Sequence, residues 1–220
     1  MVRGRSLIFG LILSAAAAAT AQLPGFEMPS LKYNPALMMI PAVQKELHVS
    51  PQAAQKATQA MATEAQKVFP ALMGAMGGKT PNGDQSKQLL VALTRMQDIA
   101  TKDLTPAQKA RLHQITLQSY GPKALLDPQV AAEVGLTPKQ ESEIKVAIGR
   151  IKQSQQKPNM SGGPGASGFD MKGLQDSAKK SRQQSDAALD AILTPKQKLK
   201  WKAAQGAHVD LGPLGQMMAG

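Results

Sequence analysis

The chain of 220 residues contains no cysteine. This absence excludes disulfide bonds, thiolate metal sites and catalysis by a thiol. It also excludes a lipid anchor on a cysteine after the apolar N-terminal segment. Folding must therefore depend on the packing of the chain itself.

Aromatic residues are scarce as well, at 3% of the sequence, and Trp201 is the single tryptophan. The apolar fraction consists mainly of Ala, Leu and Met. Because such small or slender side chains bury little area per helical turn, we expect thin cores between long helices. We expect Trp201 to anchor helix packing.

No segment alternates apolar and polar residues over a sustained length, so strands are not expected. Apolar residues recur instead at steps of three and four, in an earlier and a later part of the chain. The earlier stripes are Ala54, Ala57, Met61, Ala65, Val68 and Leu72, and Leu89, Leu93, Met96 and Ala100. The later stripes are Ile144, Ala147 or Ile148, and Ile151, and Leu174, Ala178, Ser181, Ser185, Leu189 and Ile192. This spacing predicts an all-α fold.

A short motif occurs four times, with an apolar residue, a hydroxyl residue and a proline in succession. Three copies have the full form Leu-Thr-Pro-x-Gln: Leu104, Thr105, Pro106 and Gln108; Leu136, Thr137, Pro138 and Gln140; and Leu193, Thr194, Pro195 and Gln197. The remaining copy, Val49-Ser50-Pro51, has Ala53 where the glutamine is expected.

Each copy of the motif predicts the start of a helix. A residue before proline is pushed out of the α region, which suits an N-cap, and proline fits the first helical position. The glutamine three residues after the cap can accept from the cap's own N–H, which completes a capping box. We expect the leucine before each full cap to be buried against another helix, and the cap at Ser50 to be weaker.

The motifs are spaced as in a duplicated sequence. The segment from Pro41 to Pro51 reappears from Pro128 to Pro138, at an offset of 87 residues, and Leu104 matches Leu193 at 89. A glycine-rich break, at 74–78 and 161–165, lies between the paired motifs. Helices rich in Ala, Gln and Lys also align by composition alone, but composition does not align prolines, caps and breaks.

The sequence therefore predicts two tandem copies of a bent helical-hairpin unit, packed as a thin antiparallel bundle. The first unit spans 35–121 and the second 122–207, and 208–220 form a loose tail. Each unit is expected to contain a short helix, a long helix, a glycine-rich tip, a second long helix and a final helix that a motif begins.

The N-terminus has the features of an export signal. Arg3 and Arg5 precede an apolar core at 7–13, and Ala19-Thr20-Ala21 fits a cleavage site. The apolar stretch is shorter than the roughly 20 residues of a membrane span. We expect a cleavable signal peptide at 1–21, an N-terminal extension at 22–34, and a mature protein that is periplasmic or secreted, soluble and not lipidated.

These motifs in a small, basic, helical, exported chain resemble the periplasmic LTxxQ-motif family that includes Spy and CpxP. The resemblance implies bent helical hairpins that pair into a thin, cradle-shaped dimer. It also implies an ATP-independent chaperone or an adaptor of an envelope-stress sensor. Since this chain carries two units, we expect it to build the pair within itself, as a monomeric pseudo-dimer, or to form a homodimer by exchanging units. Ala53 departs from the family pattern.

The formal net charge of +11 should attract anionic partners. The resemblance implies a basic surface that draws in acidic, unfolded segments, with the candidate residues Lys109, Arg111, Lys145, Arg150, Lys152, Lys179, Lys180 and Arg182. A further run, Lys196, Lys198, Lys200 and Lys202, divides between two helical faces, Lys196 with Lys200 and Lys198 with Lys202, which is typical of a solvated surface.

No catalytic constellation or phosphate-binding loop is found, so we expect neither an enzyme nor a cofactor. The methionines of the first unit are expected to fill helical seams: Met38, Met39, Met61, Met73, Met76 and Met96. Only Met73 and Met76 are spaced for copper, and the three histidines, His48, His113 and His208, are far apart for zinc. Whether the first unit binds a metal stays open.

Two classes of function remain. The favoured one is an exported binding protein that holds unfolded or misfolded polypeptides without nucleotide. The alternative is a non-enzymatic structural or adaptor protein that bridges envelope components or makes weak contact with anionic surfaces. Specific nucleic-acid binding is not expected, because the basic charge has no stacking aromatics beside it.

Overall fold

A computed structural model describes residues 32–76, 83–155 and 171–212. All regular structure in these residues is helical, which confirms the predicted all-α class. The chain divides into two compact units. Unit 1 contains the described residues up to Thr116 and those from Val209 onward, and unit 2 contains Leu117–His208. The predicted signal peptide at 1–21 lies outside the described residues.

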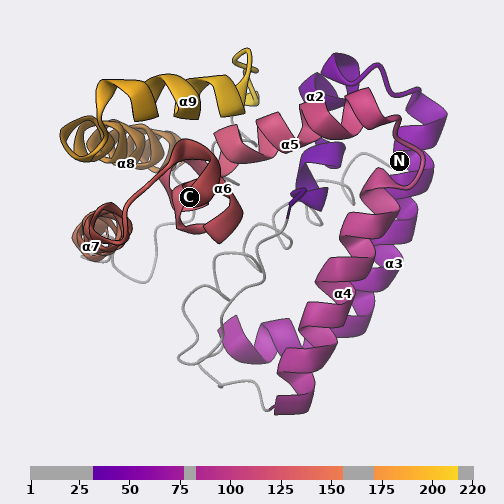
Figure 1. Cartoon of the computed structure of the whole chain (residues 1–220). Coiled ribbons are helices and arrows are strands. Elements are labelled where there is room, and N and C mark those ends of the chain that lie inside the picture. The colour runs from indigo at the N-terminus through magenta and orange to yellow at the C-terminus, as the bar shows by residue number, and fades with distance from the viewer. Residues whose placement is uncertain (1–31, 77–82, 156–170, 213–220) are drawn as a thin grey trace. The chain divides into compact units, whose positions relative to one another are not determined.

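Unit 1 is a helical hairpin with shorter helices at its base. Its 3-10 helix η1 spans Pro35–Met39, and its α-helices are α2 (Pro41–Glu46), α3 (Pro51–Met76), α4 (Gly83–Thr101) and α5 (Pro106–Tyr120). Helices α3 and α4 lie side by side along most of their length (Figure 1). Of the predicted glycine-rich break, Gly74–Met76 belong to α3, and 77–82 lie outside the described residues.

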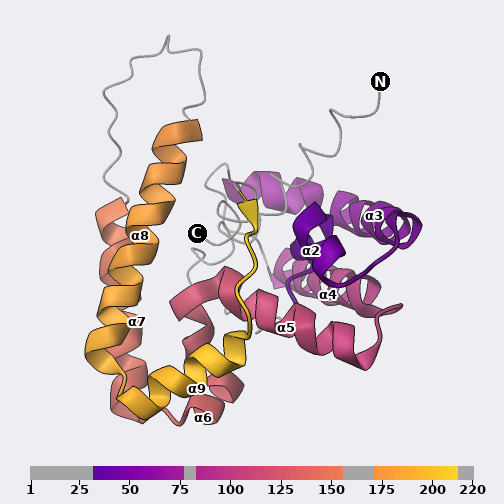
Figure 2. The ribbon, with the colours of Figure 1, turned by 90° about the horizontal axis from the view of Figure 1, so that it is seen from above.

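Unit 2 has the same order of elements. Its 3-10 helix η2 spans Gly121–Leu126, followed by α6 (Pro128–Val134), α7 (Pro138–Gln155), α8 (Met171–Ile192) and α9 (Pro195–Gln205). Helices α7 and α8 form the hairpin, and α9 lies against α6 (Figure 2). The second predicted glycine-rich break, at 161–165, lies outside the described residues.

The backbone repeats in detail at the offset of 87 residues. His48 and Gly135, which end α2 and α6, both have positive φ, at 51° and 79°. A left-handed residue commonly ends a helix, and glycine takes this conformation without strain. Tyr33 and Tyr120 also correspond, and each packs against the core of its own unit. The repeated order and this repeated turn support the interpretation that the units are copies.

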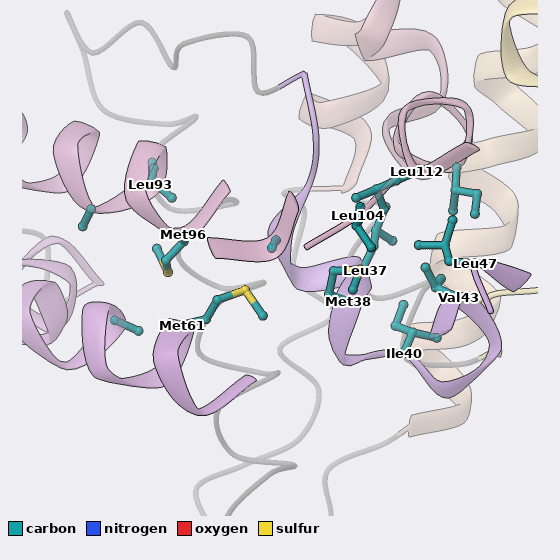
Figure 3. Close-up of a cluster of buried hydrophobic side chains, with 14 of the residues drawn as sticks. Leu37, Met38, Ile40, Val43, Leu47, Met61, Leu93, Met96, Leu104 and Leu112 are labelled. Atoms are coloured by element: carbon teal, nitrogen blue, oxygen red, sulfur yellow. The ribbon is translucent and has the colours of Figure 1, made fainter. Parts of the chain in front are cut away.

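The core of unit 1 joins the hairpin to the helices at its base. Met61 of α3 and Met96 of α4 lie on the hairpin side of the cluster (Figure 3). Leu37 and Val43 come from η1 and α2, and Leu112 from α5; all three are fully buried. The predicted stripe at Leu89, Leu93, Met96 and Ala100 is confirmed as buried. Methionine therefore fills the seams of this core, as expected for Met38, Met61 and Met96.

The core of unit 2 is smaller and depends more on branched and aromatic side chains. Ile144 of α7, Leu189 of α8 and Trp201 of α9 are buried in one cluster with Leu125 of η2. The predicted role of Trp201 in helix packing is confirmed. The side chains of the predicted stripe residues Leu72, Leu174, Ala178 and Ser181 lie outside the described part of the chain.

The units do not begin and end where the sequence placed them. Leu117 and Tyr120, in the last turn of α5, pack in the core of unit 2, ahead of the predicted boundary at 121/122. Val209 is only 8% exposed and packs in the core of unit 1. The prediction of a loose tail from 208 is therefore wrong at Val209, because this apolar side chain is buried. Residues 213–220 are outside the described segments.

Candidate functional site

All four motif prolines begin a helix. Pro51 starts α3, Pro106 starts α5, Pro138 starts α7 and Pro195 starts α9, so the predicted helix starts are confirmed. The proline lacks the N–H that would have no partner in the first helical turn.

The three full motifs form the predicted capping boxes. At the start of α9, the N–H of Gln197 donates to Thr194 Oγ1 at 3.4 Å, and the N–H of Thr194 donates to Gln197 Oε1 at 3.0 Å. The same two bonds measure 3.3 and 3.1 Å between Thr137 and Gln140. Between Thr105 and Gln108, they measure 3.3 and 2.8 Å.

The first motif has half of a capping box. The N–H of Ala53 donates to Ser50 Oγ at 3.2 Å, but the alanine methyl group returns no bond. The weaker cap expected from Ala53 is therefore present in the structure.

The apolar residues that precede the caps are buried to different degrees. Leu104 and Leu193 are buried in the cores of their units, as predicted. Leu136 and Val49 are only partly buried, although both pack against the cores.

In unit 2, the two motif glutamines also bond to each other. Gln140 Nε2 donates to Gln197 Oε1 at 2.9 Å, and Gln197 Nε2 donates to Gln140 Oε1 at 3.0 Å. The second amide proton of Gln140 goes to the carbonyl of Ile192 at 3.0 Å, and that of Gln197 to the carbonyl of Gly135 at 2.7 Å. We call this reciprocal pair, Gln140 and Gln197, the glutamine clasp.

The glutamine clasp has a local two-fold pattern. Each glutamine accepts from its own threonine and donates to a carbonyl two residues before the partner's threonine. The clasp therefore supplies donors to two helix ends and holds the starts of α7 and α9 together.

Unit 1 has no glutamine clasp, because Ala53 stands where Gln140 stands in unit 2. Gln108 Nε2 still donates to the carbonyl of Leu47, at 2.6 Å. The paired motifs thus have a structural role in both units, and unit 2 has the complete form.

An open groove lies on unit 1 between α3 and α4. Its volume is about 260 Å³, and its apolar lining consists of Val68, Val91 and Ala92. Its polar lining consists of Glu64, Lys67, Lys87, Gln88 and Arg95. Three cations and one anion therefore surround a small apolar surface.

Glu64 is held within this set of cations. Lys67 Nζ donates to Glu64 Oε1 at 2.5 Å, and Arg95 Nη1 lies 3.7 Å from Glu64 Oε2. The hydrogen bond from Lys67 lowers the pKa of Glu64, and burial of the carboxylate opposes this effect. Glu64 is thus ionised at neutral pH, and the groove keeps a net positive charge.

The residues of the predicted basic surface come from both units. Lys109 and Arg111 belong to unit 1, whereas Lys145, Arg150 and Lys180 are exposed on helices of unit 2. The side chains of Lys152, Lys179 and Arg182 lie outside the described part of the chain.

Arg111 is engaged within unit 1. Its Nε and Nη2 both lie 2.9 Å from Glu46 Oε1, and its Nη1 donates to Gln114 at 2.9 Å. This side chain holds α5 against α2 and is a poor candidate for client binding.

The cations of the groove, Lys67, Lys87 and Arg95, were not among the sequence candidates. They come from two helices, and their meeting depends on the register of the hairpin. The position of Lys67 next to the buried Val68 indicates that Lys67 lies at the edge of the helix contact. The sequence does not identify the residues of α4 that face Lys67.

Neither metal ligation nor membrane crossing has support in the residues that the structure describes. They contain no cluster of three or more His, Asp or Glu that could hold a metal ion. The side chains of Met73 and Met76 are outside this part. None of the described helices combines the length and hydropathy of a membrane span.

The chain was also compared with known proteins. No family model, no curated protein and no solved structure matches it.

Proposed function

We propose that this chain is an exported helical binding protein that holds unfolded or misfolded polypeptides without nucleotide. The observation that carries the proposal is the groove between α3 and α4, where three cations and one carboxylate surround an apolar surface. The resemblance of the paired motifs to the LTxxQ family supports the same function.

The groove is suited to an extended chain more than to a small molecule. Small-molecule sites enclose most of their ligand in a pocket of about 300–1,000 Å³, whereas this groove is open and measures about 260 Å³. An unfolded polypeptide offers apolar side chains to Val91 and Ala92 and carboxylates to Lys87 and Arg95. Each of these contacts is weak and does not require a fixed sequence in the client. A surface that holds many clients needs contacts of this kind.

The positive charge has a kinetic role in this proposal. A surface with a net charge raises the rate of encounter with partners of the opposite sign. Because exposed charges are screened over about 10 Å at 0.1 M salt, the capture of acidic clients should weaken as salt is added. The apolar contacts should then limit the release of the client.

Suppression of aggregation tests the proposal. The full chain is mixed at equal ratio with a denatured, acidic client at low salt, and light scattering is followed in the absence of ATP. We expect aggregation to slow. The variant Val91→Asp should lose most of this effect, because it places a charge on the apolar surface of the groove.

The matched control is Val146→Asp on α7. Val91 and Val146 are both on hairpin helices and are 48% and 49% exposed, so we expect the two substitutions to disturb folding to a similar extent. Val146→Asp should keep the activity. Equal loss in both variants would exclude the groove as the binding surface, and no suppression by the unmodified chain would refute the holding function. An adaptor protein, the alternative function, leaves aggregation unchanged.

A further inference from the structure

Helix α9 presents an apolar strip that is left exposed by the residues that the structure describes. Leu199 is 70% exposed, the highest value among the large exposed apolar residues of the described chain. Pro195 and Ala203, one turn before and after it, are exposed as well. The opposite face of α9 is buried through Gln197 and Trp201.

Lysines lie along both sides of this strip. At about 100° per residue, Lys196 and Lys200 fall on one side of Leu199, and Lys198 and Lys202 on the other. The division of the lysine run into two faces, which looked typical of a solvated surface, therefore leaves an exposed leucine between the two rows. The sequence of α9 contains no acidic residue.

Two of these lysines have partners within unit 2. Lys198 Nζ lies 2.9 Å from Asp190 Oδ1, and Lys200 Nζ donates to the carbonyl of Glu133 at 3.3 Å. Lys196 and Lys202 are exposed and form no ion pair with any described residue. They provide the cations that are available to a partner.

We propose that the exposed face of α9 docks on the surface of a membrane that contains anionic lipids. Leu199 inserts at the boundary between headgroups and acyl chains, and Lys196 and Lys202 extend their ammonium groups to the lipid phosphates. Helices with an apolar strip flanked by lysines bind membrane surfaces in this way. This docking goes beyond the holding of polypeptides and would localise that activity at the membrane.

The residue types favour a lipid surface over other anionic partners. Lysine is a point charge that does not select a particular ligand geometry, and α9 has no arginine for bidentate recognition. Trp201 is buried and cannot stack on nucleic-acid bases. A fluid surface with many phosphates matches a face that has charge and an apolar anchor but no directional groups.

The corresponding helix of unit 1 lacks this combination. At the offset of 89 residues, Ala110 of α5 corresponds to Leu199 and Ala107 to Lys196. The docking face is therefore a property of unit 2, and α5 provides an internal control.

A local probe tests the insertion of Leu199. Because the chain has no cysteine, Leu199→Cys and Ala110→Cys can each carry one environment-sensitive fluorophore in the full chain. With phosphatidylglycerol vesicles, we expect a blue shift from the probe at 199 and none at 110. Phosphatidylcholine vesicles should shift neither probe. No shift at 199, or equal shifts at both positions, would overturn the proposal.

Charge removal tests the role of the lysines. The variant Lys196→Gln/Lys202→Gln should weaken binding to phosphatidylglycerol vesicles about tenfold or more, since each lysine near a membrane contributes about a fivefold gain. The control Lys56→Gln/Lys102→Gln removes the same charge from exposed positions of unit 1 and should change binding little. An equal loss in both variants would mean attraction by net charge alone. Binding of soluble polyglutamate with no vesicle binding would also overturn the proposal.

Discussion

The side-chain amides of Gln140 and Gln197 donate to each other, at 2.9 and 3.0 Å, across the starts of α7 and α9. The two residues are 57 positions apart in the chain. Each also completes the cap of its own helix, so local capping and a long-range contact depend on the same two side chains. In unit 2, each motif glutamine therefore has a second role besides capping its own helix, which is the contact with the other motif.

The missing glutamine of unit 1 can be restored. The variant Ala53→Gln should complete the cap at Ser50 and place a second amide near Gln108, as in unit 2. We expect unit 1 to gain about 1 kcal/mol in free energy of unfolding, the usual net value of an added hydrogen bond. Slower hydrogen exchange in peptides from α3 and α5 would show this gain. Unchanged exchange would mean that the two motif starts of unit 1 are not arranged for a clasp.

Two neighbouring positions of α7 should respond differently to truncation. Ile144 is fully buried, so Ile144→Ala should lower the free energy of unfolding of unit 2 by about 2–5 kcal/mol. Val146 is exposed on the same helix, and Val146→Ala should change the free energy of unfolding by less than about 0.5 kcal/mol. Urea unfolding followed by Trp201 fluorescence reports on unit 2, because this single tryptophan lies in its core. Similar losses would contradict the helical register.

Unit 2 should lose stability in strong base. Burial raises the pKa of Tyr120 from 10.0 to about 12. In the unfolded chain this phenol loses its proton at about pH 10, whereas in the folded unit the phenol stays protonated until about pH 12. The unfolded state then binds fewer protons, so stability falls as pH rises through this window. The fall should be smaller in Tyr120→Phe, when urea unfolding is repeated across the same range. An identical fall would show that other groups cause it.

The helix starts could be predicted because their causes are local. The N-cap, the proline and the returning glutamine lie within four residues, and each acts through the backbone next to it. The repeated order of elements followed from the same motifs. The buried stripe of α4 followed from helical periodicity, which places Leu89, Leu93 and Met96 on one face.

The remaining features depend on contacts between distant residues. The glutamine clasp joins α7 to α9, and no local pattern indicates that the amides would meet. The cations of the groove meet only through the register of α3 against α4. Val209 is buried in the core of unit 1, whereas the three glycines and the proline within 208–220 favoured a loose tail. Arg111 was a surface candidate by type, but Glu46 engages it.

The most direct test of the glutamine clasp is a double-mutant cycle in unit 2. Gln140→Ala, Gln197→Ala and the double variant are unfolded in urea, with Trp201 fluorescence as the probe. Because the two side chains share bonds, the cost of the double variant should differ from the sum of the single costs by about 1 kcal/mol or more. Single costs that add within about 0.3 kcal/mol would show that the glutamines act as separate caps and would contradict the clasp.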